Sequence, residues 1–245
     1  MKPTLLLVIL AACGCSDGKT KPDAAVDAAL DARAIDAGHC GSDVPFTGED
    51  LDWDSTDAAF CGVFNAAFKV RGSTLAIEAD TTSPNGRFVM CIPSQATTTL
   101  DISPPTGPNP CATNPGSYAL RGIAVADAQV ETMLPATDVF RVRGFSTSRQ
   151  TTLYALIGAT YDPAKGGLMV HVAGVAHPVA ITATHDTALR FDGTAWAAGT
   201  TGIDVYFPNV PVGTTTIQGA AGTVGGIAVP IEANAITYAT IFTPT

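Results

Sequence analysis

The chain has 245 residues, of which 46% are hydrophobic and only 14% are charged, and its formal net charge at neutral pH is −9. This hydrophobic content is enough for a packed core, whereas 24 glycines and 17 prolines disfavour long helices. With 13 basic against 22 acidic residues, the composition excludes a nucleic-acid binder, which needs clustered Lys and Arg, as well as a helical bundle and a multi-span membrane protein.

The chain begins like an export signal. Lys2 supplies a positive charge, residues 5–10 form an unbroken apolar run, and small residues follow. A spanning helix needs about 18 consecutive apolar residues, and neither this run nor any later segment of the sequence reaches that length. We therefore expect residues 1–12 to be a signal peptide and the mature chain to have no membrane-spanning helix.

A cysteine follows the apolar run. Leu10-Ala11-Ala12-Cys13 resembles the lipobox of bacterial lipoproteins, in which a diacylglycerol is attached to the cysteine thiol and the peptide is cut just before it. The resemblance implies a lipid anchor, with palmitate-type acyl chains, on Cys13. Gly14 stands where many inner-membrane lipoproteins have Asp, which favours the outer membrane. Cys15 is a competing acceptor, and an ordinary cleaved signal peptide with an incidental Cys13 is the other alternative.

Residues 16–38 repeat Asp among Ala and contain almost no large side chain to bury. Such a composition is typical of a solvated linker, and a partner-binding helix is the alternative. We expect residues 13–43 to be a flexible, lipid-anchored linker that holds the folded part away from the membrane.

Four further cysteines agree with export: Cys40, Cys61, Cys91 and Cys111. An even number in an exported chain indicates disulfides, and the lack of any C-x-x-C pair argues against zinc or thioredoxin-type sites. Four cysteines allow three pairings. The shortest loops favour Cys40–Cys61 and Cys91–Cys111, each contributing about 3 kcal/mol in the chain-entropy model.

Short strands with alternating apolar and polar side chains follow in two groups. The first group includes residues 64–71 and 75–80, and Asn85-Gly86 is a strong hairpin turn. A second group begins with residues 168–173 and ends with a terminal strand. Between the groups, residues 149–157 are the only convincing helix in the sequence after the signal peptide.

Two stretches resemble a known fold family. Asn85-Gly86-Arg87-Phe88 followed by Pro93, and the stretch YFPNVPVGT over residues 206–214, resemble the carboxypeptidase-regulatory-like domains of the transthyretin-like superfamily. The resemblance covers roughly residues 57–103 and 161–220. It implies an all-β fold of antiparallel transthyretin-like or Ig-like β-sandwiches, which serve as spacers, binders and peptidase appendages and do not define one activity.

Together these observations predict two small β-sandwich units. The expected first unit comprises residues 44–135, the second comprises residues 161–245, and residues 136–160 form a connector with one short helix.

The sequence offers no complete catalytic or metal-binding motif. It contains no G-x-S-x-G, H-E-x-x-H, Walker or Rossmann pattern. His171, His177 and His185 are close in sequence, but we expect them to be surface side chains that do not converge on a metal. His185 and Asp186 are adjacent on an expected strand and so point to opposite faces. We therefore expect a protein that is not an enzyme and has no metal or cofactor.

An acidic stretch resembles a calcium loop only at its start. Asp50, Asp52 and Asp54 have the required spacing, but the sixth and twelfth positions are Ser55 and Cys61 instead of Gly and Glu. We expect this stretch to be a solvated leader of the first unit.

The sequence thus predicts a non-catalytic, lipid-anchored scaffold or interaction module of the bacterial cell envelope. Its expected partners are the membrane, through the lipid, and other envelope proteins or glycans, but not nucleic acid. The alternative is a carbohydrate- or peptidoglycan-binding surface module, in which the aromatic rings of Trp196 and Tyr206 stack on sugars.

Overall fold

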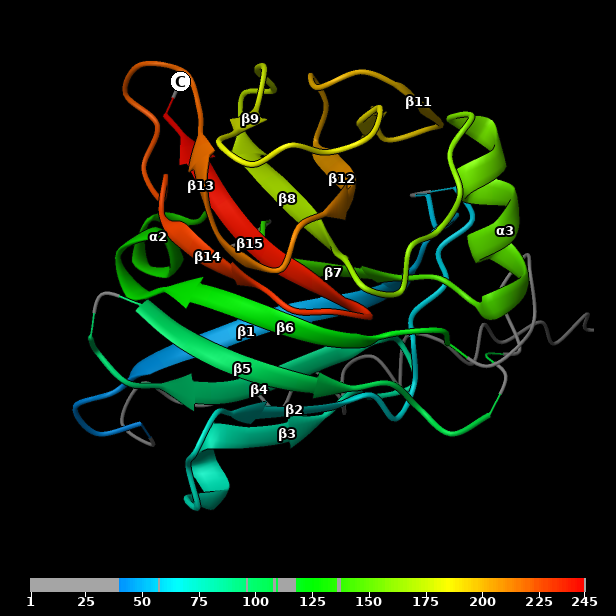
Figure 1. Cartoon of the computed structure of the whole chain (residues 1–245). Coiled ribbons are helices and arrows are strands. Elements are labelled where there is room, and N and C mark those ends of the chain that lie inside the picture. The colour runs from blue at the N-terminus through cyan, green and yellow to red at the C-terminus, as the bar shows by residue number, and fades with distance from the viewer. Residues whose placement is uncertain are drawn as a thin grey trace, which may run out of the picture. The chain divides into compact units, whose positions relative to one another are not determined.

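The structure is a computed structural model and describes residues 40–56, 58–95, 97–107, 109, 118–135 and 138–244. The expected signal peptide, Cys13, Cys15, residues 16–39 of the linker and Cys111 lie outside these residues. The strands are β1 (Val44–Asp52), β2 (Ala67–Val70), β3 (Ala79–Thr81), β4 (Arg87–Ile92), β5 (Thr97–Ser103), β6 (Arg121–Asp127), β7 (Phe140–Gly144), β8 (Gly166–Gly174), β9 (Ala180–Ile181), β10 (Leu189–Phe191), β11 (Trp196–Ala198), β12 (Asp204–Val210), β13 (Gly213–Gln218), β14 (Ala228–Ile231) and β15 (Ala235–Thr243). The helices are α2 (Ala128–Met133) and α3 (Thr147–Leu156), with a 3-10 turn at Ala76–Glu78 (Figure 1). The all-β fold class is confirmed.

Three layers of strands make up the fold. The central layer is a nine-stranded sheet of order β11-β10-β12-β8-β15-β6-β5-β2-β3. The sheet β4-β1-β7 packs on one face, and the sheet β14-β13-β9 packs on the other. Adjacent residues of a strand point to opposite faces, so Met169 enters the first core while Leu168 and Val170 enter the second.

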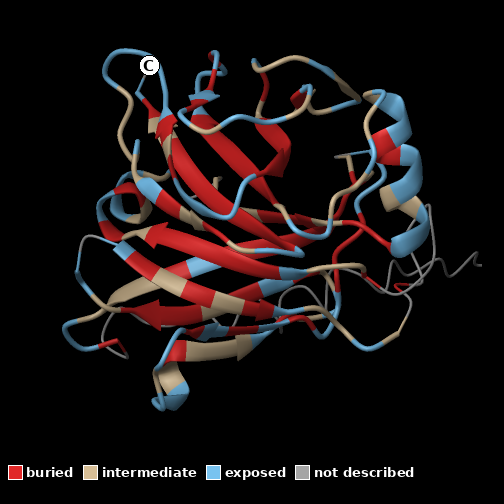
Figure 2. Cartoon of the chain, in the orientation of Figure 1, coloured by how far each residue is buried: buried red, intermediate tan, exposed pale blue. Residues whose placement is uncertain are grey.

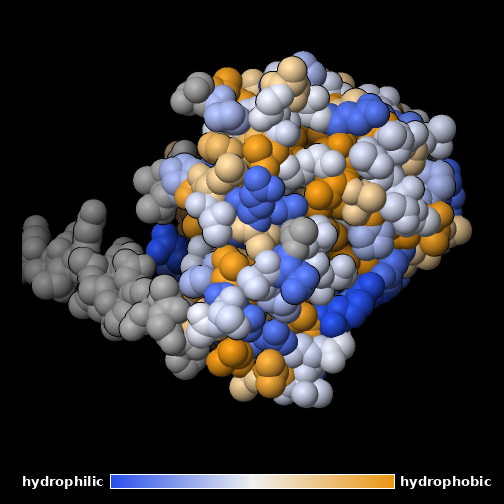
Figure 3. Space-filling view, turned by 90° about the vertical axis from the view of Figure 1, so that its left-hand side faces the viewer, coloured by the Kyte–Doolittle hydropathy of each residue, from blue (hydrophilic) through white to orange (hydrophobic). Residues whose placement is uncertain are grey.

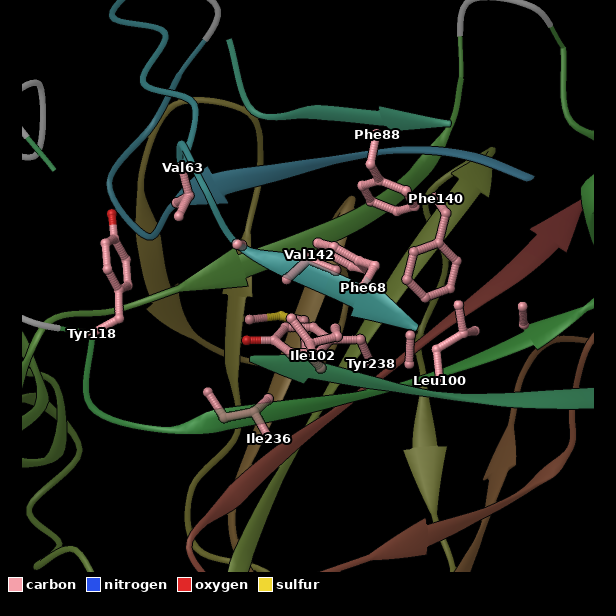
Figure 4. Packing of buried hydrophobic residues seen from close by; sticks show 14 of the residues in the cluster. Val63, Phe68, Phe88, Leu100, Ile102, Tyr118, Phe140, Val142, Ile236 and Tyr238 are labelled. Carbon is pink, nitrogen blue, oxygen red and sulfur yellow. The ribbon is translucent and has the colours of Figure 1, made fainter. Parts of the chain in front are cut away.

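The central strands are buried on both faces. Every residue of β12 is buried, and so are eight of the nine residues of β8 and of β15 (Figure 2). The first core is aromatic: the rings of Phe46, Phe68, Phe88 and Phe140 pack together, with the Phe68 and Phe88 centroids 3.9 Å apart (Figure 4). Such pairs add about 0.5–1.5 kcal/mol to the gain from burial.

The boundary expected over residues 136–160 does not separate two sheets. The last strand, β15, lies between β6 and β8 and pairs in parallel with both. Ile236 and Tyr238 of β15 belong to the same core as Phe46 of β1. The described residues therefore form one compact domain. Strand β15 of the expected second unit pairs with β6 of the expected first unit, and residues of both contribute to the same core.

Both helices begin at a side-chain cap. α3 begins two residues before the expected start, because the hydroxyl of Ser146 accepts a hydrogen bond from the backbone N–H of Arg149. α2 was not expected from the sequence. The carboxylate of Asp127 accepts hydrogen bonds from the backbone N–H groups of Gln129 and Val130, which begins this short helix.

The favoured disulfide pairing is wrong. Cys40 is bonded to Cys91, which fixes the residues just before β1 to β4. The register of this antiparallel pair places Pro45 opposite Cys91, so Cys40 needs only a short turn to reach it. Cys61 is disulfide-bonded as well.

Candidate functional site

Ionisable side chains gather between the sheet β4-β1-β7 and the central sheet. The two Asp204 carboxylate oxygens contact different cations: Oδ2 accepts from Arg143 Nε at 2.6 Å, and Oδ1 lies 2.7 Å from His171 Nδ1. The other ring nitrogen, His171 Nε2, lies 2.9 Å from Asp138 Oδ1. We call the whole set the buried charge cluster; it consists of Glu49, Glu131, Asp138, Arg141, Arg143, His171 and Asp204.

The pairing keeps Asp204 and His171 ionised in spite of burial. Burial alone would raise the pKa of Asp204, but Arg143 and His171 outweigh this effect and hold the pKa well below its ordinary value. Burial alone would lower the pKa of His171, but the carboxylates of Asp138 and Asp204 raise it above its ordinary value. His171 is therefore held as an imidazolium between two carboxylates.

Glu131 is the exception in this cluster. Its Oε1 atom is buried and has no hydrogen-bond partner. Burial, with Asp127 and Asp138 nearby, raises its pKa to about 8, and the attraction of His171 offsets this only in part. At neutral pH Glu131 is thus protonated, and the cationic Arg141, Arg143 and His171 are matched by Glu49, Asp138 and Asp204.

The contacts of the buried charge cluster connect several strands. Arg143 also donates from Nη1 to the carbonyl of Ser55 at 2.8 Å, and its guanidinium lies 4.2 Å from the centroid of the Phe191 ring. Arg141 donates from Nε to Glu49 Oε1 at 2.9 Å. These contacts join β1, β7, β8, β10 and β12, and both nitrogens of His171 are occupied by carboxylates. The expectation of a surface His171 is therefore wrong, and the sequence missed its partners because they come from distant segments.

The other two histidines lie apart from this cluster. His177 is buried, contrary to expectation, and its Nδ1 is 2.8 Å from the carbonyl oxygen of Pro178. His185 is exposed as expected, and its ring packs edge-on against Phe207. Among the described residues, no group of three or more His, Cys, Asp or Glu has the geometry of a metal site.

The acidic stretch at the end of β1 is folded into the protein, so the expected solvated leader is wrong. Asp54 forms two hydrogen bonds of 2.9 Å with the guanidinium of Arg149 on α3. Asp52 is buried, and its Oδ2 accepts from the hydroxyl of Tyr118 at 3.0 Å. Asp50 is also buried, and its Oδ1 has no hydrogen-bond partner.

Asp50 lines a small cavity of about 20 Å³ at one end of the first core. Its walls include Tyr118, Val142, Ile236 and Tyr238, which are labelled in Figure 4. A water molecule needs at least about 10–15 Å³ of such volume, so this cavity has room for one or two heavy atoms.

The proposed sugar-stacking pair does not form an exposed platform. Tyr206 is fully buried, and its hydroxyl lies 3.0 Å from that of Tyr154. Trp196 stacks on the buried Trp53 at 3.9 Å between ring centroids, and its Nε1 donates to the Trp53 carbonyl at 2.8 Å. The two side chains therefore pack the end of the first core.

Comparisons with known proteins give a weak fold likeness only. No protein-family model and no curated protein matches this chain. Among solved structures, it is similar to the Bacillus anthracis TIE protein, at 12% identity and a TM-score of 0.26, over 82% of this chain and 34% of that one. The chain thus spans about a third of that protein's length. The shaft pilin SpaA from Lactobacillus rhamnosus GG matches at 10% identity and a TM-score of 0.26, over 83% of this chain and 98% of the pilin. The minor pilin GBS52 of Streptococcus agalactiae matches at 9% identity and a TM-score of 0.21, over 82% of this chain and 97% of the pilin.

Within the part of the chain that the structure describes, neither helix is long and apolar enough to cross a membrane.

Proposed function

We propose that this protein is a non-catalytic module of the bacterial cell envelope, anchored through a lipid on Cys13 and acting by contact with other envelope components. The absence of catalysis is supported by the way in which the side chains of the buried charge cluster bind one another. Among the residues that the structure describes, His171 is the buried histidine with acidic partners, and both of its ring nitrogens are occupied by the carboxylates of Asp138 and Asp204. A general base needs a nitrogen free to take a substrate proton.

The cysteine chemistry supports the exported location. Disulfides persist in oxidising compartments and are rare where thiols are kept reduced. Cys40–Cys91 bonds the first described residue to the buried strand β4, and Cys61 is bonded too. The export-type sequence at residues 1–12 and the disulfides therefore point to the same compartment.

The surface supports a folded part that is surrounded by water. Figure 3 shows hydrophobic and hydrophilic residues interspersed over one face of the protein. Over the described ranges, the exposed large apolar side chains are single residues distributed along the sequence: Phe60, Phe64, Leu75, Met133, Leu156, Val175 and Val212. A surface of this kind is typical of a protein that keeps its folded part in water.

Metabolic labelling tests the anchor. Cells that express the full chain are grown with an alkyne analogue of palmitate, and the purified protein is assayed for label. We expect label on the wild type and on Cys15→Ser, which is the matched control, but none on Cys13→Ser. An unlabelled wild type, or a labelled Cys13→Ser, would contradict anchoring at Cys13.

Turnover assays on peptide, ester and glycoside substrates test the absence of catalysis. We expect the full chain to show no turnover above a heat-inactivated sample. His171→Asn should lower the melting temperature, because it removes the cation between Asp138 and Asp204. Turnover that disappears in His171→Asn, measured below that variant's melting temperature, would show that the proposal is wrong.

A further inference from the structure

The cavity at the end of the first core contains an unpaired acid. Asp50 is 4% exposed, and its Oδ1 has no hydrogen-bond partner. The next acid on the same face of β1, Asp52, is hydrogen-bonded to Tyr118 and repels negative charge at Asp50. No Lys, Arg or His lines the cavity. An ionised Asp50 would be a buried carboxylate without a counter-ion, which costs several kcal/mol, so only an occupant that brings positive charge would stabilise the ionised form.

The wall of the cavity next to this acid includes a glycine. Gly144 lines the cavity, and a methyl group built on it would lie 2.9 Å from the Tyr118 ring and 3.9 Å from Asp50 Oδ1. Its backbone does not have the positive φ that requires glycine. A side chain at this position would therefore press against the Tyr118 ring, which forms one wall of the cavity beside the carboxylate.

The walls favour an organic cation over a metal ion. Val142, Ile236 and Leu120 present carbon atoms to the cavity, and the described residues here include no set of three metal-ligating groups. Calcium takes six to eight oxygen ligands, and magnesium requires a near-ideal octahedron. An ammonium group with a methylene behind it satisfies both parts of the site, because its N–H groups can donate to Asp50 while its carbon contacts the apolar walls.

We propose that this cavity binds the end of a primary alkylammonium group, with Asp50 as its counter-ion. Such an alkylammonium group can belong to a lysine side chain of a partner protein or to a free alkylamine. The volume of about 20 Å³ admits only the terminal nitrogen and its neighbouring carbon, so the rest of the ligand lies outside. This inference goes beyond the proposed function and does not depend on the lipid anchor.

Protonation sets the pH dependence of this site. Burial, with Asp52 nearby, raises the pKa of Asp50 well above its ordinary value, so the empty site holds a proton. The other titratable groups that face the cavity are Tyr118 and Tyr238, whose pKa values are raised by burial, and both stay neutral at physiological pH. Binding of an ammonium group releases the proton of Asp50, so affinity should increase with pH until the amine itself loses its charge.

Thermal unfolding of the full chain tests the site, with methylammonium chloride as the probe. Tetramethylammonium chloride at equal ionic strength is the control, since it is larger and has no N–H group. We expect the melting temperature to rise saturably with methylammonium, and more at pH 8 than at pH 6. The response should disappear in Asp50→Asn and in Gly144→Ala, and remain in Asp101→Asn, an acid on the strand β5 outside the cavity.

Several results would overturn the proposal. A wild type without a saturable response to methylammonium, or an Asp50→Asn variant with the same response, would do so. If Asp50→Asn does not fold, Gly144→Ala decides, because its methyl group displaces the Tyr118 wall of the cavity and leaves the Asp50 carboxylate in place. Competition of methylammonium by a lysine-containing peptide, but not by its acetyl-lysine form, would identify a protein partner, and competition by propylamine alone would identify a small amine. None of these outcomes depends on Cys13 labelling, so the two proposals fail separately.

Discussion

Replacing Glu131 by Gln should stabilise the protein at neutral pH. The substitution keeps the shape of the side chain and removes a group that the folded state must keep protonated. The pKa of Glu131 is raised by burial from its ordinary 4.5 to about 8. A carboxyl group with a raised pKa makes folding less favourable as pH rises above 4.5, because the unfolded chain ionises there and the folded protein does not.

The size of the effect follows from the two pKa values. At pH 7 the folded state still holds the proton, whereas the unfolded chain has been ionised since pH 4.5. At about 1.4 kcal/mol per pH unit, the penalty reaches about 3 kcal/mol at pH 7 and stops growing above about pH 8. Glu131→Gln should remove most of this penalty at pH 7 and almost none at pH 4.

Urea unfolding of the full chain, followed by circular dichroism between pH 4 and pH 9, measures the difference. His171 has a raised pKa, so its stabilisation is complete below its unfolded value of 6.5 and is lost as pH rises through the folded value. This loss lowers the stability of both proteins, and it cancels in their difference below about pH 8, where Glu131 is protonated and has no charge to interact with His171. Gln129→Ala, at an exposed position of the same helix, controls for changes in helix propensity. Two curves that stay parallel from pH 4 to pH 8 would refute the reasoning.

Two further predictions concern the architecture. The double variant Cys40→Ser/Cys91→Ser should lose about 4 kcal/mol of unfolding free energy, since the disulfide closes a loop across a sequence separation of 51 residues. Urea unfolding without reductant measures this loss, and an unchanged unfolding midpoint would contradict the prediction. A fragment of residues 161–245 should show a random-coil circular dichroism spectrum, because β15 pairs with β6 and Tyr238 packs into the shared core. A cooperative thermal transition in this fragment would show instead that the second half folds alone.

The all-β class could be predicted because it follows from local properties. Alternation and frequent Gly and Pro act over a few residues and do not depend on the rest of the chain. The division into two units could not be predicted in this way. Alternation in residues 168–173 was attributed to one buried face, whereas β8 is buried on both faces because a layer of strands packs on each side of it.

The disulfide and the buried charge cluster were missed for a related reason. Loop length describes the unfolded chain, whereas the pairing of Cys40 with Cys91 is fixed by the register between β1 and β4. Asp204 looks like an isolated acid in an apolar strand until the register places it opposite His171. An acid or a histidine within such a strand is a usable signal, since it can stay charged when buried only if it has a partner.

The central position of β15 affects the order in which the strands can pair during folding. A polypeptide that is delivered from its N-terminus presents β6 and β8 well before residues 235–243 arrive to pair with both. Until then the nine-stranded sheet is divided into two parts. One part exposes the edge of β8 and the other exposes the edge of β6, and both edges lack their partner β15. Non-local parallel pairing of this kind is slow to form, so the chain should stay unfolded while it is still being threaded through a translocation pore. Under the export that we propose, closure of the sheet becomes a late step that follows translocation.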